Sequence, residues 1–240
     1  MKCFDIHTHI LPGIDDGSKS MEMTIELLKQ LSDEGVTDVI ATPHYDTHHN
    51  RQDYDNVIKL YEAVKEQAKS VDPNLNVYSG CEILYSKGIL EDIKNKKVPM
   101  LAESNHCLVE FYPRQEYYEI ENALNELLML GKTPVIAHLE RYECFYKKTD
   151  RVSEVIKMGA LVQINSSSFN CGRFNKTARF VKKLLLNGQI HFVGTDCHDP
   201  KNRRPLMKST VKYIESMVGE RALKKIIETN PTKLVSGEYI

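Results

Sequence analysis

The sequence predicts an α/β fold, a distorted (β/α)7 barrel of parallel strands with outer helices. Along the 240 residues, short apolar and β-branched runs alternate with longer stretches of helical period. Parallel strands need a crossover between them, and the crossover is most often a helix. Seven such runs are present, one fewer than a regular barrel requires. A doubly wound open sheet is the alternative, but no G-x-G-x-x-G follows the first run to support nucleotide binding.

The individual elements follow from apolar spacing and from helix stop signals. The predicted strands cover, in order, residues 3–6, 36–41, 76–80, 107–109, 134–137, 161–164 and 190–194. The predicted helices cover residues 21–34, 54–70, 120–130, 151–158, 177–186, 206–218 and 220–228. In the first helix, Leu27, Leu28 and Leu31 recur at helical spacing and Gly35 ends the pattern. The last helix is expected to stop at Asn230-Pro231.

Composition narrows the class of protein. No linker or low-complexity segment divides the chain, so residues 1–240 are predicted to form a single domain. A formal net charge of −1 argues against a nucleic-acid binder. No apolar run approaches the roughly 20 residues that span a bilayer, and the chain enters its first strand without a signal-peptide segment. We therefore expect a cytoplasmic protein that is not membrane-inserted. Its six scattered cysteines, without a C-x-x-C pair, indicate reduced thiols.

Side chains of the types that ligate metals, His, Asp and Glu, follow six of the seven predicted strands. They are His7, His9, Asp16, His44, Glu82, Glu110, His138, Asp196 and His198. The C-terminal strand ends of a β/α barrel converge on one face, where active sites lie. Loops are polar in general, but gathering these carboxylates without cations would cost heavily in repulsion and desolvation. We predict a multinuclear metal site, whose imidazole and carboxylate groups suit manganese, iron or zinc better than calcium or magnesium.

Two arginines follow ligand candidates closely. Arg141 lies three residues after His138, and Arg203 lies five residues after His198. Beside a metal site, two guanidinium groups would hold the oxygens of a phosphate in bidentate fashion. An ordinary surface salt bridge is the alternative for both.

Several motifs together resemble one family. They are His7-Thr8-His9, Asp15-Asp16-Gly17-Ser18, Thr42-Pro43-His44, Gly80-Cys81-Glu82, Val109-Glu110, His138-Leu139-Glu140-Arg141-Tyr142 and Thr195-Asp196-Cys197-His198. They resemble the PHP (polymerase and histidinol phosphatase) family. Within it they are most similar to the bacterial metal-dependent protein-tyrosine phosphatases encoded with capsule and exopolysaccharide genes. The likeness runs from residue 3 to about residue 234.

This resemblance implies a site for up to three manganese ions, with iron or zinc as substitutes. It implies one ion at His7, His9, Glu82 and Asp196, a second at Glu82, Glu110 and His138, and a third at Asp16, His44 and His198. It also implies that Arg141 and Arg203 contact the substrate phosphate. The implied substrate is phosphotyrosine on a partner tyrosine autokinase that controls polysaccharide export, with a metal-bridging hydroxide attacking phosphorus in line.

Other functions remain as alternatives. A histidinol-phosphate phosphatase or another small phosphoesterase would share the ligand set, and a non-catalytic phosphotyrosine-binding regulator would keep the fold. Cys197 and Arg203 match Cys-x5-Arg, the signature of cysteine-dependent phosphatases, but the intervening Asp199 and Pro200 do not suit a phosphate-binding loop. The oligomeric state is left open.

Two loops raise a choice between substrate contact and an ordinary solvated surface. The first covers residues 45–54, with His48, His49 and Arg51, and the second contains Tyr112, Arg114, Tyr117 and Tyr118. By contrast, His106 and His191 stand at the beginning of predicted strands. We expect these two histidines to face the opposite end of the barrel and to be structural.

Overall fold

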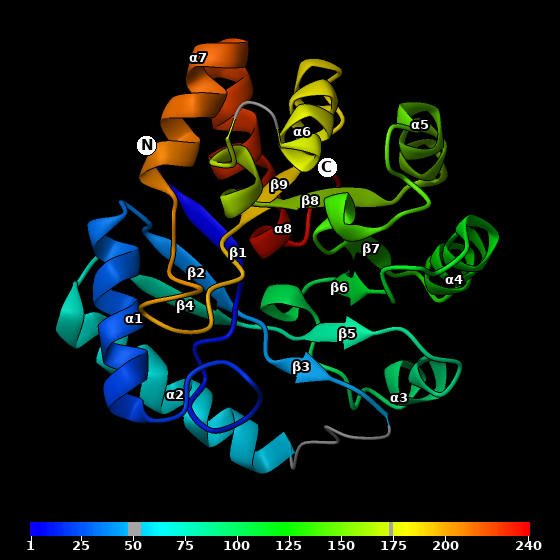
Figure 1. Cartoon of the computed structure of the whole chain (residues 1–240). Coiled ribbons are helices and arrows are strands. Elements are labelled where there is room, and N and C mark those ends of the chain that lie inside the picture. Colours follow the sequence, from blue (N-terminus) through cyan, green and yellow to red (C-terminus); the bar gives the residue numbers. More distant parts are fainter. Residues whose placement is uncertain (48–53, 173–174) are drawn as a thin grey trace.

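The computed structural model describes residues 1–47, 54–172 and 175–240. Its parallel strands curl around a common centre, and the helices lie outside them (Figure 1). One sheet has the order β1-β2-β4 and the other the order β3-β5-β6-β7-β8-β9. The strands are β1 (Phe4–Thr8), β2 (Asp38–Ala41), β3 (His44–Tyr45), β4 (Asn76–Ser79), β5 (Glu82–Leu84), β6 (His106–Glu110), β7 (Thr133–Ile136), β8 (Leu161–Asn165) and β9 (Phe192–Gly194).

Two of the predicted strands continue beyond a break that the sequence analysis did not place. β2 passes into β3 through Thr42-Pro43, and β4 passes into β5 through Gly80-Cys81. Pro43 lacks the N–H that a continuous ladder needs. At Gly80, a Cβ would come within 3.0 Å of side-chain atoms of Ile40 and Leu101. The chain therefore changes sheet at these two points, just before His44 and Glu82.

The barrel closes between its first and last strands. The backbone N–H of His9 donates to the carbonyl of Cys197 at 3.0 Å, and that of Asp196 donates to His7 at 2.8 Å. With β2–β3 and β4–β5 each counted as one broken strand, seven strands surround the centre. The predicted (β/α)7 barrel is confirmed.

The helices are α1 (Met21–Asp33), α2 (Tyr54–Val71), α3 (Ile89–Lys94), α4 (Tyr117–Met129), α5 (Thr149–Met158), α6 (Lys176–Leu186), α7 (Lys208–Lys224) and α8 (Asn230–Ser236). Helix α1 begins where the Ser20 side chain accepts a hydrogen bond from the N–H of Met23, and it buries Leu27, Leu28 and Leu31 against the sheet. The predicted stop at Asn230-Pro231 is wrong. Pro231 lies in the first turn of α8, directly after the π-helical turn Lys225–Thr229, so the chain is helical on both sides of this proline.

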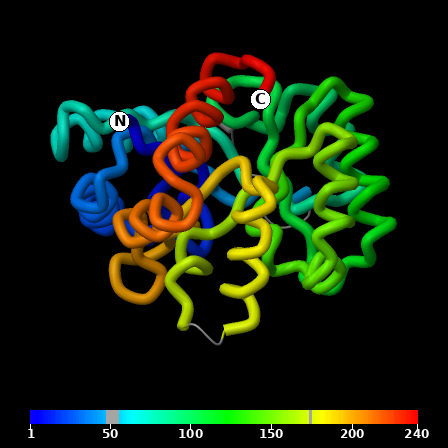
Figure 2. Tube along the Cα trace, turned by 90° about the horizontal axis from the view of Figure 1, so that it is seen from above, coloured from blue at the N-terminus to red at the C-terminus, as the bar shows by residue number. Residues whose placement is uncertain are grey.

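The interior of the barrel is apolar below the strand ends. Phe4, Ile6, Leu108, Val135 and Phe192 form a buried cluster there, together with Leu234 of α8. Figure 2 shows α8 and the C-terminus, in red, at one end of the barrel, and the orange segment that follows β9 toward the opposite end. The polar candidate ligands lie at this second end. Within the described ranges, no helix combines the length and apolarity needed to cross a membrane.

Candidate metal centre

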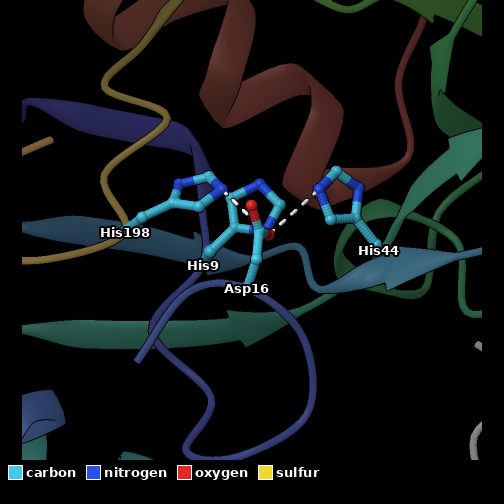
Figure 3. Close-up of side chains that lie close together, drawn as sticks. All are labelled: His9, Asp16, His44 and His198. Atoms are coloured by element: carbon cyan, nitrogen blue, oxygen red, sulfur yellow. Dashed lines mark ion pairs between the residues drawn. The ribbon is translucent and has the colours of Figure 1, made fainter. Parts of the chain in front are cut away.

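The predicted ligand residues meet at the open, C-terminal end of the strands. Three groups of potential ligand atoms each lie within 4.8 Å of one another. They are His9, Asp16, His44 and His198; then His7, His9 and Glu82; and finally His44, Glu82 and Glu110. Figure 3 shows the rings of His9, His44 and His198 gathered around the carboxylate of Asp16. His138 and Asp196 contact members of these groups, as the distances below show.

Glu82 is the central carboxylate. Its Oε2 lies 3.2 Å from Nε2 of His7, 3.3 Å from Nε2 of His9 and 3.1 Å from Nδ1 of His44. Its Oε1 lies 2.8 Å from Nε2 of His138, and Glu110 approaches the same nitrogen at 3.4 Å. Because both oxygens of one buried carboxylate face separate groups of histidines, Glu82 is placed to bridge two cations.

Asp196 joins the site to the two arginines. Its Oδ1 lies 3.4 Å from Nε2 of His9 and 3.6 Å from Nε2 of His7. Its Oδ2 accepts hydrogen bonds from Nη2 of Arg141 at 2.7 Å and lies 2.8 Å from Nη2 of Arg203. The arginine side chains remain 43% and 40% exposed, so each guanidinium group also faces solvent. Both arginines therefore lie beside the centre as predicted, with donors left for a second anion.

Hydrogen bonds to Nδ1, on the side of each ring away from the centre, orient three of the histidines. Nδ1 of His9 bonds Oδ2 of Asp15 at 2.8 Å, Nδ1 of His7 lies 3.2 Å from Oε1 of Gln163, and Nδ1 of His198 donates to the carbonyl of Asp196 at 3.0 Å. With Nδ1 carrying the proton, the lone pair of Nε2 points into the site in each ring. Asp15 is itself buried, and burial opposes ionisation, but the bond to His9 keeps the pKa of Asp15 well below its usual range.

Strand β8 contributes residues that the sequence analysis missed. It is the strand without a predicted ligand, yet Gln163 and Asn165 point into the site from it. Oε1 of Gln163 accepts from the N–H of His138 at 2.7 Å, and its Nε2 donates to Asn165 at 2.8 Å. Asn165 in turn donates to Oδ2 of Asp196 at 2.8 Å. Two amides alternating within an otherwise apolar buried strand are the sequence signal that identifies them.

Close backbone approaches fix the positions of the first candidate ligands. A Cβ on Gly17 would lie 2.3 Å from the carbonyl oxygen of His9, and a Cβ on Gly194 would lie 2.5 Å from Cβ of His7. His138 and Asp196 have φ values of +31° and +54°, a region that L-residues rarely adopt. Such strain is concentrated at functional sites, where the surrounding contacts enforce it.

The buried charges are balanced against one another. Burial alone would raise the pKa of Glu82, yet the facing rings of His7 and His138 hold that pKa well below its usual range. Burial would lower the pKa of His138, but the carboxylates of Glu110 and Glu82 raise it to about 9. Protons on these histidines and divalent cations between the ligands are alternative ways to offset the carboxylate charges.

The donor set fits divalent cations. Among the described residues, Oε2 of Glu82 and Nε2 of His198 are buried atoms that make no hydrogen bond, and their neighbours at 3.1–3.3 Å are other candidate ligand atoms. A buried polar atom without a partner is costly, and a metal ion satisfies a carboxylate oxygen and an imidazole lone pair at once. The nine predicted ligands and the two arginines thus converge on a single site, and their roles as ligands and phosphate contacts remain predictions.

The remaining candidates lie apart from this chemistry. Cys197 is fully buried, and burial together with the nearby Asp5 raises the pKa of its thiol, so it is unsuited to act as a thiolate nucleophile. Tyr112 and Tyr118 are exposed, while Tyr117 bonds Glu154 and Arg114 pairs with Glu143.

Three further predicted positions, His48, His49 and Arg51, lie outside the described residues. His106 begins β6, and His191 lies just before β9. Both therefore lie toward the end of the barrel opposite the site, as expected.

Comparisons with known proteins give one consistent result. The family described as capsular polysaccharide synthesis, CpsB/CapC, matches residues 3–236. The tyrosine-protein phosphatase CpsB of Streptococcus pneumoniae is 34% identical over 241 residues, which cover 98% of this chain and 99% of that protein. The tyrosine-protein phosphatase YwqE of Bacillus subtilis is 28% identical over 248 residues, which cover 98% and 92%.

Solved structures agree. A crystal structure of YwqE from Bacillus subtilis and CpsB from Streptococcus pneumoniae, described as metal-dependent tyrosine phosphatases, matches with a TM-score of 0.90 and 26% identity, covering 99% of this chain and 96% of that chain. The histidinol phosphate phosphatase of Lactococcus lactis matches with a TM-score of 0.64 and 16% identity over 91% and 95% of the chains, which concerns the fold alone. The barrel, its ligand-lined end and these matches lead to one conclusion: the chain belongs to the CpsB/CapC family of capsular polysaccharide synthesis.

Proposed function

We propose that residues 1–240 form a single-domain, metal-dependent protein-tyrosine phosphatase that hydrolyses phosphotyrosine on a partner protein. The observation that supports this proposal most directly is the convergence of four carboxylates and five histidines with two half-exposed arginines at one end of the barrel. The names of the relatives, tyrosine-protein phosphatases CpsB and YwqE, supply the substrate class. We further propose manganese as the metal and a bacterial tyrosine kinase of capsule or exopolysaccharide synthesis as the cytoplasmic partner.

The ligand sets proposed for the three ions are those that the family resemblance implies, and they overlap the observed groups without matching them residue for residue. His7, His9, Glu82 and Asp196 would hold one ion, Glu82, Glu110 and His138 a second, and Asp16, His44 and His198 a third. When bound, such cations supply Lewis acidity toward the phosphoryl group and activate water for attack. The mixed imidazole and carboxylate ligands also suit iron and zinc.

The chain's own residues would bind and orient the phosphoryl group. Arg141 and Arg203 both reach Oδ2 of Asp196 and still face solvent, so their remaining N–H groups can donate to phosphate oxygens. Asp196 fixes both guanidinium groups before substrate arrives, which reduces the entropy lost on binding. Charge that develops on the phosphoryl oxygens would be stabilised by these donors. A tyrosine leaving group, with a pKa of about 10, departs without strong help from an acid.

The experiment compares three substrates under controlled metal loading. Protein stripped of metal by a chelator is reloaded with Mn²⁺, Fe²⁺ or Zn²⁺, and phosphate release is measured from a phosphotyrosine peptide, a phosphoserine peptide and histidinol phosphate. The His138→Ala protein serves as the blank, with its melting temperature recorded to show that it is folded. Manganese-dependent release mainly from phosphotyrosine is expected. Preference for histidinol phosphate would overturn the substrate, and release that survives chelation would overturn the metal dependence.

A further inference from the structure

A basic groove lies outside the residues used so far. It has a volume of about 350 Å³ and is lined by Tyr146, Lys147, Lys176, Arg179, Phe180 and Lys183. Four of these six residues are cationic and none is acidic. Because the chain as a whole carries a formal charge of −1, this concentration of positive charge is local. We define these six residues as the basic groove.

The groove cations lack carboxylate partners among the described residues, and Lys147 Nζ lies 5.3 Å from the ring centre of Tyr146. Within the part of the chain that the structure describes, neither Lys147 nor the three cations of α6 form an ion pair with a carboxylate. Lys176, Arg179 and Lys183 follow one another at helical spacings of three and four, so they share one face of α6. Like charges at this spacing destabilise a helix. An anion bound in the groove would relieve that repulsion.

The groove lies near the turn that carries Arg141. Tyr146 and Lys147 follow the 3-10 turn η2 (Leu139–Arg141), which carries Arg141, and α6 packs against this turn. Helix α6 begins in the segment after the C-terminal end of β8, so its first cations lie toward the end of the barrel that holds the metal centre. The rings of Tyr146 and Phe180 meet edge to face at 5.9 Å and give the groove an apolar wall. A chain that extends from the metal centre past Arg141 therefore meets cations beside a hydrophobic surface.

We propose that the basic groove binds acidic residues flanking the phosphotyrosine of the protein substrate. The inference rests on the proposed function, because it assigns a second contact to the same substrate. Carboxylates or further phosphate groups on the partner would pair with Arg179 and the lysines. Aliphatic or aromatic parts of the same segment would pack on Tyr146 and Phe180. The groove would then select acidic phosphotyrosine segments over neutral ones without touching the reacting atoms.

The test separates docking from catalysis. The Arg179→Gln/Lys183→Gln protein removes two groove cations, and Lys182→Gln is the matched control, since Lys182 is exposed on the same helix but does not line the groove. The substrates are a phosphotyrosine peptide with four flanking glutamates, the same peptide with four glutamines, and p-nitrophenyl phosphate. We expect the double variant to raise KM for the glutamate peptide about tenfold, corresponding to about 0.7 kcal/mol for each lost charge contact. Turnover of p-nitrophenyl phosphate and of the glutamine peptide should stay unchanged.

A binding measurement makes the docking site testable without turnover. Fluorescence anisotropy on the metal-loaded protein, with the labelled glutamate peptide carrying a non-hydrolysable phosphotyrosine analogue, should show weaker binding to the double variant by the same factor, and binding should weaken with salt. If the wild-type protein binds both peptides equally, or the double variant behaves as Lys182→Gln does, the docking site is refuted. Tighter binding of single-stranded DNA than of the peptide would equally overturn it. Groove-dependent binding without phosphate release would leave the docking site standing and refute the proposed phosphatase function.

Discussion

The buried amide of Gln163 is predicted to set the affinity of the metal centre although it is not a ligand. Gln163 is fully buried. It accepts from the N–H of His138 at 2.7 Å, lies 3.2 Å from Nδ1 of His7 and donates to Asn165 at 2.8 Å. The change Gln163→Leu keeps a branched side chain, shorter by one atom, and removes all three contacts. It leaves Nδ1 of His7 without the acceptor that orients its ring.

Two magnitudes follow from these contacts. A buried polar group left without its partner costs about 1–3 kcal/mol, so losing three contacts should lower the free energy of unfolding by about 3–5 kcal/mol. Removing a hydrogen bond that orients a metal-bound histidine typically lowers metal affinity about 10–100-fold. The loss of metal affinity acts through the orientation of His7 and His138. It should therefore be larger in Gln163→Leu than in a variant that only loses the same stability.

The assay therefore compares Gln163→Leu with a second buried glutamine. Gln189 donates to the carbonyl of Thr149 at 2.8 Å and to Oγ of Ser153 at 2.9 Å, just before β9, toward the end opposite the site. The Gln189→Leu protein should lose comparable stability in urea denaturation. Calorimetric titration with Mn²⁺, at a temperature where both proteins are folded, should show reduced affinity for Gln163→Leu alone. Equal manganese affinity in the two variants would refute the orienting role of Gln163.

Three further predictions concern the ligands, the buried thiol and pH. Glu82→Gln should lower the number of bound manganese ions by two and Glu110→Gln by one, since Glu82 faces two groups of histidines. Elemental analysis measures the bound manganese, and equal losses in the two variants would refute a bridging Glu82. Cys197→Ala should keep phosphatase turnover within about threefold, because burial raises the pKa of this thiol; a loss of a hundredfold would restore the thiolate mechanism. Burial lowers the pKa of His106 to about 4, so the unfolded chain takes up a proton first as pH falls below about 6.5. Between pH 7 and pH 4.5, the free energy of unfolding measured in urea should therefore fall by about 2–3 kcal/mol more in the wild type than in His106→Gln. An identical dependence of this free energy on pH in the two proteins would contradict the prediction.

The order of strands and helices could be predicted because each element leaves a periodic pattern. The elements that were missed leave none. Helix α3 spans six residues, too few for apolar spacing to be distinguished from a loop. The breaks before His44 and Glu82 depend on packing around Gly80, which involves Leu101, distant in sequence. Pro231 indicates a helix end and a first helical turn equally well, and only packing of α8 against the barrel decides between them.

The candidate ligands could be predicted because ligand-type residues stand directly after apolar runs, and a barrel brings those positions together. Their supporting residues were harder to find. Asp15 and Asp16 are adjacent and chemically identical, yet Asp15 is buried against His9 while the Asp16 side chain is 63% exposed. The difference arises from the turn that Gly17 permits, where a Cβ would collide with His9. Sequence alone identifies both as carboxylates and cannot divide them between orienting a ring and facing the centre.

The division of charge between the candidate metal centre and the basic groove would explain how the proposed phosphatase recognises a protein substrate. The centre contains Asp16, Glu82, Glu110 and Asp196, so without cations it would repel a phosphate and any acidic segment around it. Bound cations and the two arginines offset that charge only locally, because screening limits the reach of a charge to about 10 Å. An acidic segment extending beyond this range is neither repelled nor attracted by the centre, so attraction there has to come from other cations. The cations of α6, adjoining the turn that carries Arg141, are placed to provide it.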